Sequence, residues 1–334
     1  MKIVKVFLVL TILTIFIGGA YFYYAEHNGG ALPSFINTHT TNQKYIIKKA
    51  GRVVAGAETQ EEVIEKASNI SRSIAVNTYN DKWVYADLNP FLIFAGDVIH
   101  DFEYFYEAVQ YAKRNGYDKV YYKTPDVILW EEDASQVETT LLNVPVILQG
   151  SELPNGCEVT SLAMIMKYAG LDIDKMTLAS EVKKESSTYK LENGRIKYGN
   201  PYNGYVGDIF GTGYGVYHGP IAELAQQYLG ERVIDLTGLS FEEVTYILQK
   251  GYPIWIITNA LYKPLEDSQF EIWHTPTGIV KITFKLHSVV MTGIDESKVY
   301  INDPKRTSKN IGYDKEQFKK AWEQMGNQAI VILD

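Results

Sequence analysis

The chain contains a single cysteine, Cys157, among its 334 residues. One cysteine permits neither an intramolecular disulfide nor a multi-cysteine metal site, so the fold must be held together by a buried apolar core. Apolar residues make up 46% of the chain and charged residues 22%, an ordinary globular mixture that can supply such a core. A free thiol is most often a small buried hydrophobic group, which is the first interpretation of Cys157.

The charge and length of the chain exclude some classes of protein. The formal net charge of -8 argues against a nucleic-acid-binding protein, which needs a basic face to displace counterions from phosphates. The 6 histidines are scattered without the spacing of metal ligands, so we expect neither a metal nor another cofactor. The length suits two domains better than one.

The N-terminal residues 1–26 predict a membrane-targeting segment rather than part of the fold. Lys2 and Lys5 precede an uncharged apolar run, Val6 to Ala25, which as a helix would cross a hydrocarbon core of roughly 30 Å. The lysines would stay in the cytoplasm, and the rest of the chain would lie outside. Small residues near the end of the run leave a cleaved signal peptide open. We therefore expect an extracytoplasmic protein, either membrane-anchored or secreted.

Two segments precede the second half of the chain. Residues 27–43 are polar and without periodicity, and they predict a linker. Residues 44–135 predict a small α+β module with two copies of one unit, since helical apolar stripes at Val63 and Ala108 lie 45 positions apart. Each stripe is followed by a strand, a tight turn and another strand. The module lacks a catalytic cluster, so it either supports the next domain or binds a surface partner.

Residues 136–334 predict a second domain with helices first and strands after them, an α+β layout. Residues 185–217 are rich in glycine and tyrosine and predict a long surface loop. A capping box at Ser240 and Glu243 starts one of the helices. The predicted helices are 157–168, 176–184, 220–228, 241–250 and 314–325, and the predicted strands are 254–258, 279–284, 286–292, 299–302 and 329–333.

The position of Cys157 changes its interpretation. The residue follows Pro154-Asn155-Gly156 and lies in the first turn of a predicted helix. The free N–H groups and the dipole at a helix N-terminus favour a negative charge, so we expect a lowered thiol pKa and a reactive thiolate. Gly156 allows a sharp turn and a close backbone approach. Cys157 is therefore a candidate nucleophile.

A nucleophilic cysteine needs a general base, and His287 is the best candidate. It alone among the histidines lies inside an apolar predicted strand, where a polar ring needs a partner. A turn at 295–297 returns the chain to Asp303, so we expect Asp303 to face His287, accept its Nδ1 proton and fix its tautomer. An ordinary core histidine and an ordinary turn aspartate are the alternatives.

The motifs around these residues resemble a known family. The run from Asn143-Val144-Pro145 through Leu-Pro-Asn-Gly-Cys-Glu-Val-Thr-Ser-Leu-Ala-Met resembles the double-glycine leader peptidases, which process bacteriocins, and more closely their standalone relatives. His287 within His-Ser-Val-Val-Met-Thr-Gly and Asp303 within Asn-Asp-Pro match the second and third motifs of that family. The order Cys, His, Asp is that of papain-like enzymes. The resemblance covers roughly residues 140–334.

The resemblance implies a papain-like cysteine peptidase domain, with an N-terminal helix that carries Cys157 and an antiparallel sheet that carries His287 and Asp303. It also implies that Gln149 donates its side-chain amide to the oxyanion hole, beside the Cys157 backbone N–H. Leader peptidases are usually fused to an ATP-driven exporter, whereas this chain has no phosphate-loop motif. The resemblance therefore leaves the substrate open.

These observations together predict an extracytoplasmic thiol peptidase that hydrolyses a peptide or protein substrate through a Cys-His-Asp triad and a thioester. Two alternatives remain open. A cell-wall amidase or transpeptidase could use the same triad, since a different acceptor site would suffice. A catalytically inert surface-binding protein is the other.

Overall fold

The computed structural model describes residues 43–132, 139–186, 188–190 and 196–334. The chain folds into two compact units, Met1–Asp101 and Phe102–Asp334. The predicted targeting segment, residues 1–26, and all but the last residue of the predicted linker, 27–43, lie outside the described residues. Within the described ranges, no helix is both long enough and apolar enough to cross a membrane.

The first unit contains an antiparallel sheet with a helix packed on it. The strand order is β2-β1-β3-β4, formed by β1 (Tyr45–Lys49), β2 (Arg52–Ala57), β3 (Ser73–Asn77) and β4 (Trp83–Ala86). Helix α2 (Gln60–Ser68) begins where the Thr59 side chain accepts a hydrogen bond from the Glu62 N–H. Val63 and Ala67 of α2 are buried in one cluster with Ile47 and Ala75 of the sheet. Strands β5 (Phe91–Ala95) and β6 (Val98–Phe102) follow.

The second copy of the unit has the same element order. Strands β5 and β6 are followed by α3 (Phe105–Asn115), β7 (Lys119–Tyr122) and β8 (Ile128–Glu131), as β1 and β2 are followed by α2, β3 and β4. The structure groups α3, β7 and β8 with the second unit, whereas the sequence placed the domain boundary after residue 135. Glu243 joins these elements to the rest of the second unit, since its Oε1 accepts hydrogen bonds from Trp130 Nε1 at 2.9 Å and Lys113 Nζ at 2.6 Å.

The second unit is built on an antiparallel sheet with the order β15-β22-β16-β19-β20-β21, in which β9 also pairs with β19. Its strands are β9 (Thr140–Leu141), β15 (Val233–Asp235), β16 (Ile254–Asn259), β19 (Leu286–Ile294), β20 (Lys298–Asn302), β21 (Ile311–Asp314) and β22 (Ala329–Ile332). The antiparallel sheet after an early helix confirms the predicted α+β class.

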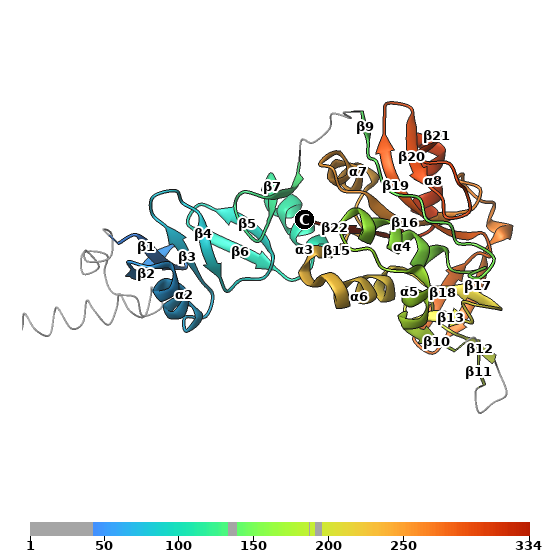
Figure 1. Cartoon of the computed structure of the whole chain (residues 1–334), viewed down its shortest axis with the longest axis horizontal. Coiled ribbons are helices and arrows are strands. Elements are labelled where there is room, and N and C mark those ends of the chain that lie inside the picture. Colours follow the sequence, from blue (N-terminus) through green and yellow to red (C-terminus); the bar gives the residue numbers. More distant parts are fainter. Residues whose placement is uncertain (1–42, 133–138, 187, 191–195) are drawn as a thin grey trace, which may run out of the picture. The chain divides into compact units, whose positions relative to one another are not determined.

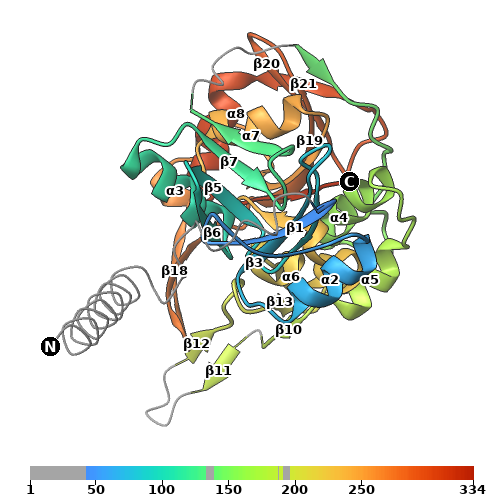
Figure 2. The ribbon, with the colours of Figure 1, turned by 90° about the vertical axis from the view of Figure 1, so that its left-hand side faces the viewer.

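Helices cover both faces of this sheet. Helices α4 (Cys157–Tyr168) and α6 (His218–Leu229) lie on one side, and α7 (Phe241–Gln249) and α8 (Lys315–Gln324) lie on the other (Figures 1 and 2). Trp255 and Ile257 of β16 share the core cluster of α4 and α6. Side chains alternate along a strand, so the intervening residues face α7 and α8. The two covered faces explain why all six residues of β16 are buried.

The stretch 185–217, predicted as a surface loop, is partly a buried structure. Parallel and antiparallel pairing joins β10 (Lys184–Glu185), β13 (Tyr205–Gly207) and β14 (Gly213–Gly215), and β11 (Thr188–Lys190) pairs with β12 (Ile196–Tyr198). Tyr205 and Val216 are fully buried. The surface-loop prediction was therefore wrong for this segment, because short strands between glycines show no hydrophobic period. In both views β11 and β12 lie side by side at one edge of the second unit (Figures 1 and 2).

The remaining elements complete the second unit. The predicted strand 279–284 belongs to a separate two-stranded sheet rather than to the central sheet. The remaining elements of the second unit are α5 (Lys175–Glu181), the 3-10 helices η2 (Gly230–Arg232) and η3 (Asp267–Gln269), and the paired strands β17 (Glu271–Thr275) and β18 (Gly278–Ile282).

Replacing Glu243 tests how α3 and β8 are held. Glu243 also closes the capping box of α7, since its Oε2 accepts from the Ser240 N–H at 2.7 Å. We expect Glu243→Ala to lower the free energy of unfolding by about 2 kcal/mol, because it removes a helix cap and leaves the Trp130 N–H unpaired. Thermal and urea unfolding measure the change.

Glu242→Ala is the matched control, because the adjacent Glu242 is exposed and forms a surface ion pair with Lys319. Such a pair typically contributes about 0.2–1 kcal/mol, which is less than the loss expected for Glu243→Ala. Equal losses of stability in the two variants would contradict the role given to Glu243.

Candidate active site

Cys157 is the first residue of α4, and the chain around it turns tightly. Gly156 is the N-cap residue, and its N–H donates to the Leu153 carbonyl at 3.2 Å. A Cβ at position 156 would lie 2.2 Å from Leu153 Cγ, so any side chain there would collide with a buried leucine. The Thr160 hydroxyl donates back to the Gly156 carbonyl at 2.7 Å. These contacts hold Cys157 at the N-terminus of the helix, as the sequence predicts.

Two hydrogen bonds fix the position of α4 on the sheet. Trp255 Nε1 on β16 donates to the Glu158 carbonyl at 2.9 Å. The Ser161 hydroxyl on α4 donates to the Ser288 carbonyl on β19 at 3.1 Å. Because Ser288 follows His287 directly, the second bond ties the cysteine end of the helix to the strand that carries the histidine.

His287 and Asp303 form a buried pair, with exposed fractions of 1% and 3%. His287 Nε2 lies 2.8 Å from Asp303 Oδ1. The predicted partnership of the two residues is therefore observed, but the expected ring nitrogen, Nδ1, is wrong. The register pairs Val290 with Asn302, so Asp303 lies level with Val289, two residues away from His287, and the imidazole reaches it with Nε2, the nitrogen farther from the backbone.

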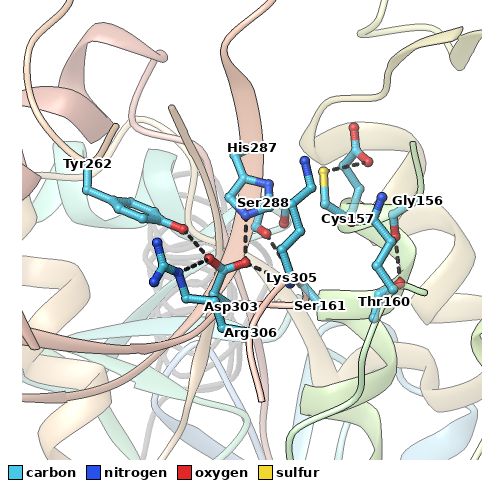
Figure 3. Close-up of polar contacts among 12 residues, drawn as sticks. Gly156, Cys157, Thr160, Ser161, Tyr262, His287, Ser288, Asp303, Lys305 and Arg306 are labelled. Carbon is cyan, nitrogen blue, oxygen red and sulfur yellow. Dashed lines mark hydrogen bonds and ion pairs between the residues drawn. The ribbon is translucent and has the colours of Figure 1, made fainter. Parts of the chain in front are cut away.

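The second ring nitrogen of His287 is available to a reacting group. An aspartate that accepts from Nε2–H leaves Nδ1 as an acceptor. His287 Nδ1 is buried and has no hydrogen-bond partner within the part of the chain that the structure describes. Figure 3 shows the imidazole with Asp303 at one edge and Cys157 beyond the other.

Asp303 is held as a carboxylate by several donors. Tyr262 donates its hydroxyl to Oδ2 at 2.7 Å, the Lys305 N–H donates to Oδ1 at 2.8 Å, and Arg306 Nε lies 3.4 Å from Oδ2. Burial by itself would raise the pKa of Asp303, but the bond to His287 and the other donors outweigh it and hold the pKa well below its usual range. Asp303 therefore stays ionised.

The thiol of Cys157 has a different environment from the one that the sequence predicts. Burial raises the pKa of the thiol well above its usual range, and the neighbouring Glu158 carboxylate raises it further. The Ser288 backbone and the charge of Lys305 oppose this rise less strongly. The expected lowering by the helix N-terminus is therefore wrong for this structure, because burial and a neighbouring carboxylate outweigh a helix dipole.

The sequence reasoning missed three residues of the site: Glu158, Tyr262 and Lys305. Cys157 Sγ donates to Glu158 Oε2 at 3.2 Å. A signal for Glu158 existed, since it is the only acidic residue in the helix and directly follows the cysteine. Lys305 follows the Asn-Asp-Pro motif closely, and Figure 3 shows its side chain extending between His287 and Cys157 in that view. The position of Tyr262 carries no local signal.

Gln149 is buried beside the start of α4, with 3% of its surface exposed. Its N–H donates to the Pro304 carbonyl at 2.7 Å, and its carbonyl accepts from Lys175 Nζ at 2.8 Å. Its side-chain Nε2 donates to the Pro154 carbonyl at 2.5 Å. An amide nitrogen carries two hydrogens, so one remains for the predicted oxyanion role. That role stays a prediction.

A second histidine–aspartate pair lies elsewhere in the unit. His218 Nδ1 lies 2.5 Å from Asp235 Oδ2, which joins the start of α6 to β15. In the described ranges, no group of three or more His, Cys, Asp or Glu side chains is arranged to hold a metal ion. The pair therefore has the geometry of a structural contact.

Comparison with known proteins gives consistent matches to the second unit. The model of the Peptidase_C39 like family matches residues 141–330. The uncharacterized protein YvpB of Bacillus subtilis (strain 168) is 48% identical over 186 residues, which are 55% of this chain and 72% of that protein. A crystal structure of a C39-like peptidase from Bacillus anthracis superposes with a TM-score of 0.56 at 46% identity, covering 59% of this chain and 98% of that one.

Tyr262→Phe tests the support of Asp303. The substitution removes a donor from a buried carboxylate, so we expect a loss of about 1–3 kcal/mol in the free energy of unfolding at neutral pH. Since the pKa of Asp303 is held below its usual value, its contribution is present above about pH 4 and is lost as the pH falls further. The difference in the free energy of unfolding between Tyr262→Phe and the wild type should therefore become smaller in acid. Chemical unfolding at several pH values measures this difference.

Tyr300→Phe is the control for this comparison. Tyr300 donates its hydroxyl to Asp295 Oδ2 at the same distance, 2.7 Å, but in a solvent-exposed turn. We expect Tyr300→Phe to lower the free energy of unfolding much less than Tyr262→Phe does. A Tyr262 variant as stable as the Tyr300 variant would show that Asp303 does not need this donor.

Proposed function

The chain belongs to the Peptidase_C39 like family, and from this premise we propose that it is a cysteine peptidase whose triad is Cys157, His287 and Asp303. The observation that carries the proposal is the buried His287–Asp303 pair beside the cysteine end of α4, in which His287 Nδ1 has no hydrogen-bond partner among the described residues. A general base needs an acceptor nitrogen directed at the nucleophile and a partner that fixes its tautomer. Asp303 is the partner that fixes the tautomer of His287, and Figure 3 shows Cys157 on the side of the imidazole away from Asp303.

The reaction follows from the roles of these groups. His287 Nδ1 takes the thiol proton, and the thiolate attacks the carbonyl carbon of the scissile peptide bond. The Cys157 N–H and the Gln149 amide donate to the oxyanion that forms. His287 then gives its proton to the leaving amine, and a thioester remains. Water attacks the thioester with His287 as base, and this step releases the acid and restores the thiol.

Asp303 acts through His287 in this scheme. The imidazolium that forms after proton transfer is buried, and an isolated buried cation is costly. Asp303 supplies the opposite charge at 2.8 Å and is itself held by the Tyr262 hydroxyl and the Lys305 N–H. The arrangement therefore stabilises the charged form of His287 that the mechanism needs.

We place the reaction outside the cytoplasm on the pattern of the N-terminal residues. The two early lysines and the apolar run from Val6 to Ala25 favour an anchored or secreted protein with its second unit outside. The substrate is accordingly an extracytoplasmic peptide or protein. Protease accessibility of the domain on intact cells tests this placement.

Substitution of the triad tests the peptidase proposal. We expect Cys157→Ala to abolish casein hydrolysis and labelling by an epoxide-type thiol inhibitor, and His287→Ala to reduce kcat at least about 100-fold, since the thiol then lacks its base. Cys157 is the only cysteine in the sequence, so any thiol label reports on this residue alone. Hydrolysis of a fluorogenic casein and intact-protein mass spectrometry are the measurements.

His218→Ala is the matched control, because it disrupts the other histidine–aspartate pair. We expect it to retain activity. Hydrolysis that survives in Cys157→Ala would refute the proposal. Release of fragments from purified cell wall, or transfer to an added amine, with no casein cleavage would instead favour the amidase or transpeptidase. A protein that is inactive in the casein, cell-wall and amine-transfer assays would instead be interpreted as a surface-binding protein.

Gln149→Ala tests the oxyanion role. Loss of one oxyanion donor typically costs about 100- to 1,000-fold in kcat, and we expect that loss here with KM little changed. Steady-state kinetics on a peptide substrate separate the two parameters. A rise in KM at constant kcat would instead assign Gln149 to substrate binding.

A further inference from the structure

Glu158 is an ionisable residue buried in the centre of the site. It belongs to a run of ten buried residues from Cys157 to Met166, and 1% of its own surface is exposed. Within the described ranges, the structure assigns it no ion-pair partner within 4.0 Å. A buried carboxylate without a paired cation is costly, so its presence needs an explanation.

The carboxyl group of Glu158 occupies a specific pocket. Its Oε2 accepts from Cys157 Sγ at 3.2 Å, and its Oε1 accepts from the Val216 N–H at 3.1 Å. Gly215 has a φ of +145°, and a Cβ there would lie 2.4 Å from Glu158 Oε1 and 2.5 Å from Leu286 Cδ2. A residue with a side chain at 215 would therefore displace the carboxyl group.

The groups around the carboxyl leave its charge largely uncompensated. Cys157 lies on its own helix, His287 on β19, Tyr205 on β13, and Tyr214 and Tyr217 on and after β14. Burial raises the pKa of these three tyrosines, so they stay neutral. Lys305, after β20, is the cation that acts on both the thiol and Glu158, and its side chain is exposed.

The thiolate of Cys157 and the carboxylate of Glu158 are unfavourable together, because they repel each other at short range. A thiolate at Cys157 and a carboxylate at Glu158 would lie 3.2 Å apart in a buried site, so each strongly opposes the ionisation of the other. Burial raises the pKa of Glu158 to about 7, so the carboxyl group changes its charge near neutral pH. The thiolate is favoured where Glu158 is protonated and its O–H can donate to sulfur.

We propose that Glu158 controls the formation of the Cys157 thiolate: its carboxylate accepts the thiol hydrogen in the resting site, and its protonated form donates a hydrogen bond to the thiolate in the reactive site. The proposal rests on Cys157 being the nucleophile of the proposed peptidase. It explains why the thiol contacts Glu158 while the buried Nδ1 of His287 has no partner among the described residues.

The proton balance defines the pH dependence. In the resting form the thiol is protonated, Glu158 is ionised and His287 is neutral. In the reactive form Glu158 has gained one proton from solvent, and the thiol proton has moved to His287 Nδ1. The reactive form therefore holds one proton more than the resting form, and activity falls as the pH rises through about 7.

Glu158→Gln tests the proposal, because a glutamine can still accept from the Val216 N–H and can donate to a thiolate without carrying a charge. We expect its alkylation by iodoacetamide at pH 8 to be at least about tenfold faster than that of the wild type, which corresponds to a thiol pKa lowered by one unit or more. We also expect peptidase activity to persist above pH 7. Glu296→Gln, at an exposed turn, is the control and should match the wild type.

Alkylation needs no peptide substrate, so the test gives an answer even if the peptidase proposal fails. Equal or slower alkylation of Glu158→Gln would overturn the role of Glu158. Should that variant fail to fold, the thiolate absorbance of the wild type near 240 nm can be titrated with Cys157→Ala as the blank for tyrosine. Thiolate absorbance that decreases as the pH rises through about 7 supports the proposal, and a titration without such a decrease overturns it.

Discussion

Helix α4 is buried against the central sheet along nearly its whole length, and the site depends on where that helix lies. Its apolar residues share a core with Trp255 and Ile257 of β16 and Val290 of β19. The bonds from Trp255 Nε1 and from the Ser161 hydroxyl then set its position along the sheet. Close packing and hydrogen bonds to the same two strands together fix the N-terminus of α4 beside His287.

The pKa values of the two buried carboxyl groups of the site, Asp303 and Glu158, are shifted in opposite directions. Asp303 receives hydrogen bonds from His287, Tyr262 and the Lys305 N–H, and these donors keep it ionised. Glu158 receives a weak thiol donor and one backbone N–H, and burial lifts its pKa to about 7. Groups whose environments push their pKa values apart are suited to separate acid and base roles. The contrast gives Asp303 a permanent charge and Glu158 a variable one.

Glu243 has two structural roles in the second unit. Glu243 caps its own helix through Ser240 and binds Trp130 and Lys113 of the second repeat copy. Tyr246, one turn further along α7, donates its hydroxyl to Glu131 at 3.2 Å. Helix α3 and strands β7 and β8 of the second copy therefore belong to the same compact unit as the active site.

The sequence by itself determined the α+β class, the family and the elements that carry Cys157, His287 and Asp303, because periodicity, glycine and a hairpin turn are local properties of the chain. Tertiary structure alone decided that Nε2 rather than Nδ1 of His287 meets Asp303, since that choice depends on the register of β19 and β20. It also decided the direction of the thiol pKa, which burial and Glu158 raise although a helix N-terminus favours the opposite. Burial and charge proximity are sums over residues distant in sequence, such as Val216 and Tyr262, and no local pattern contains them.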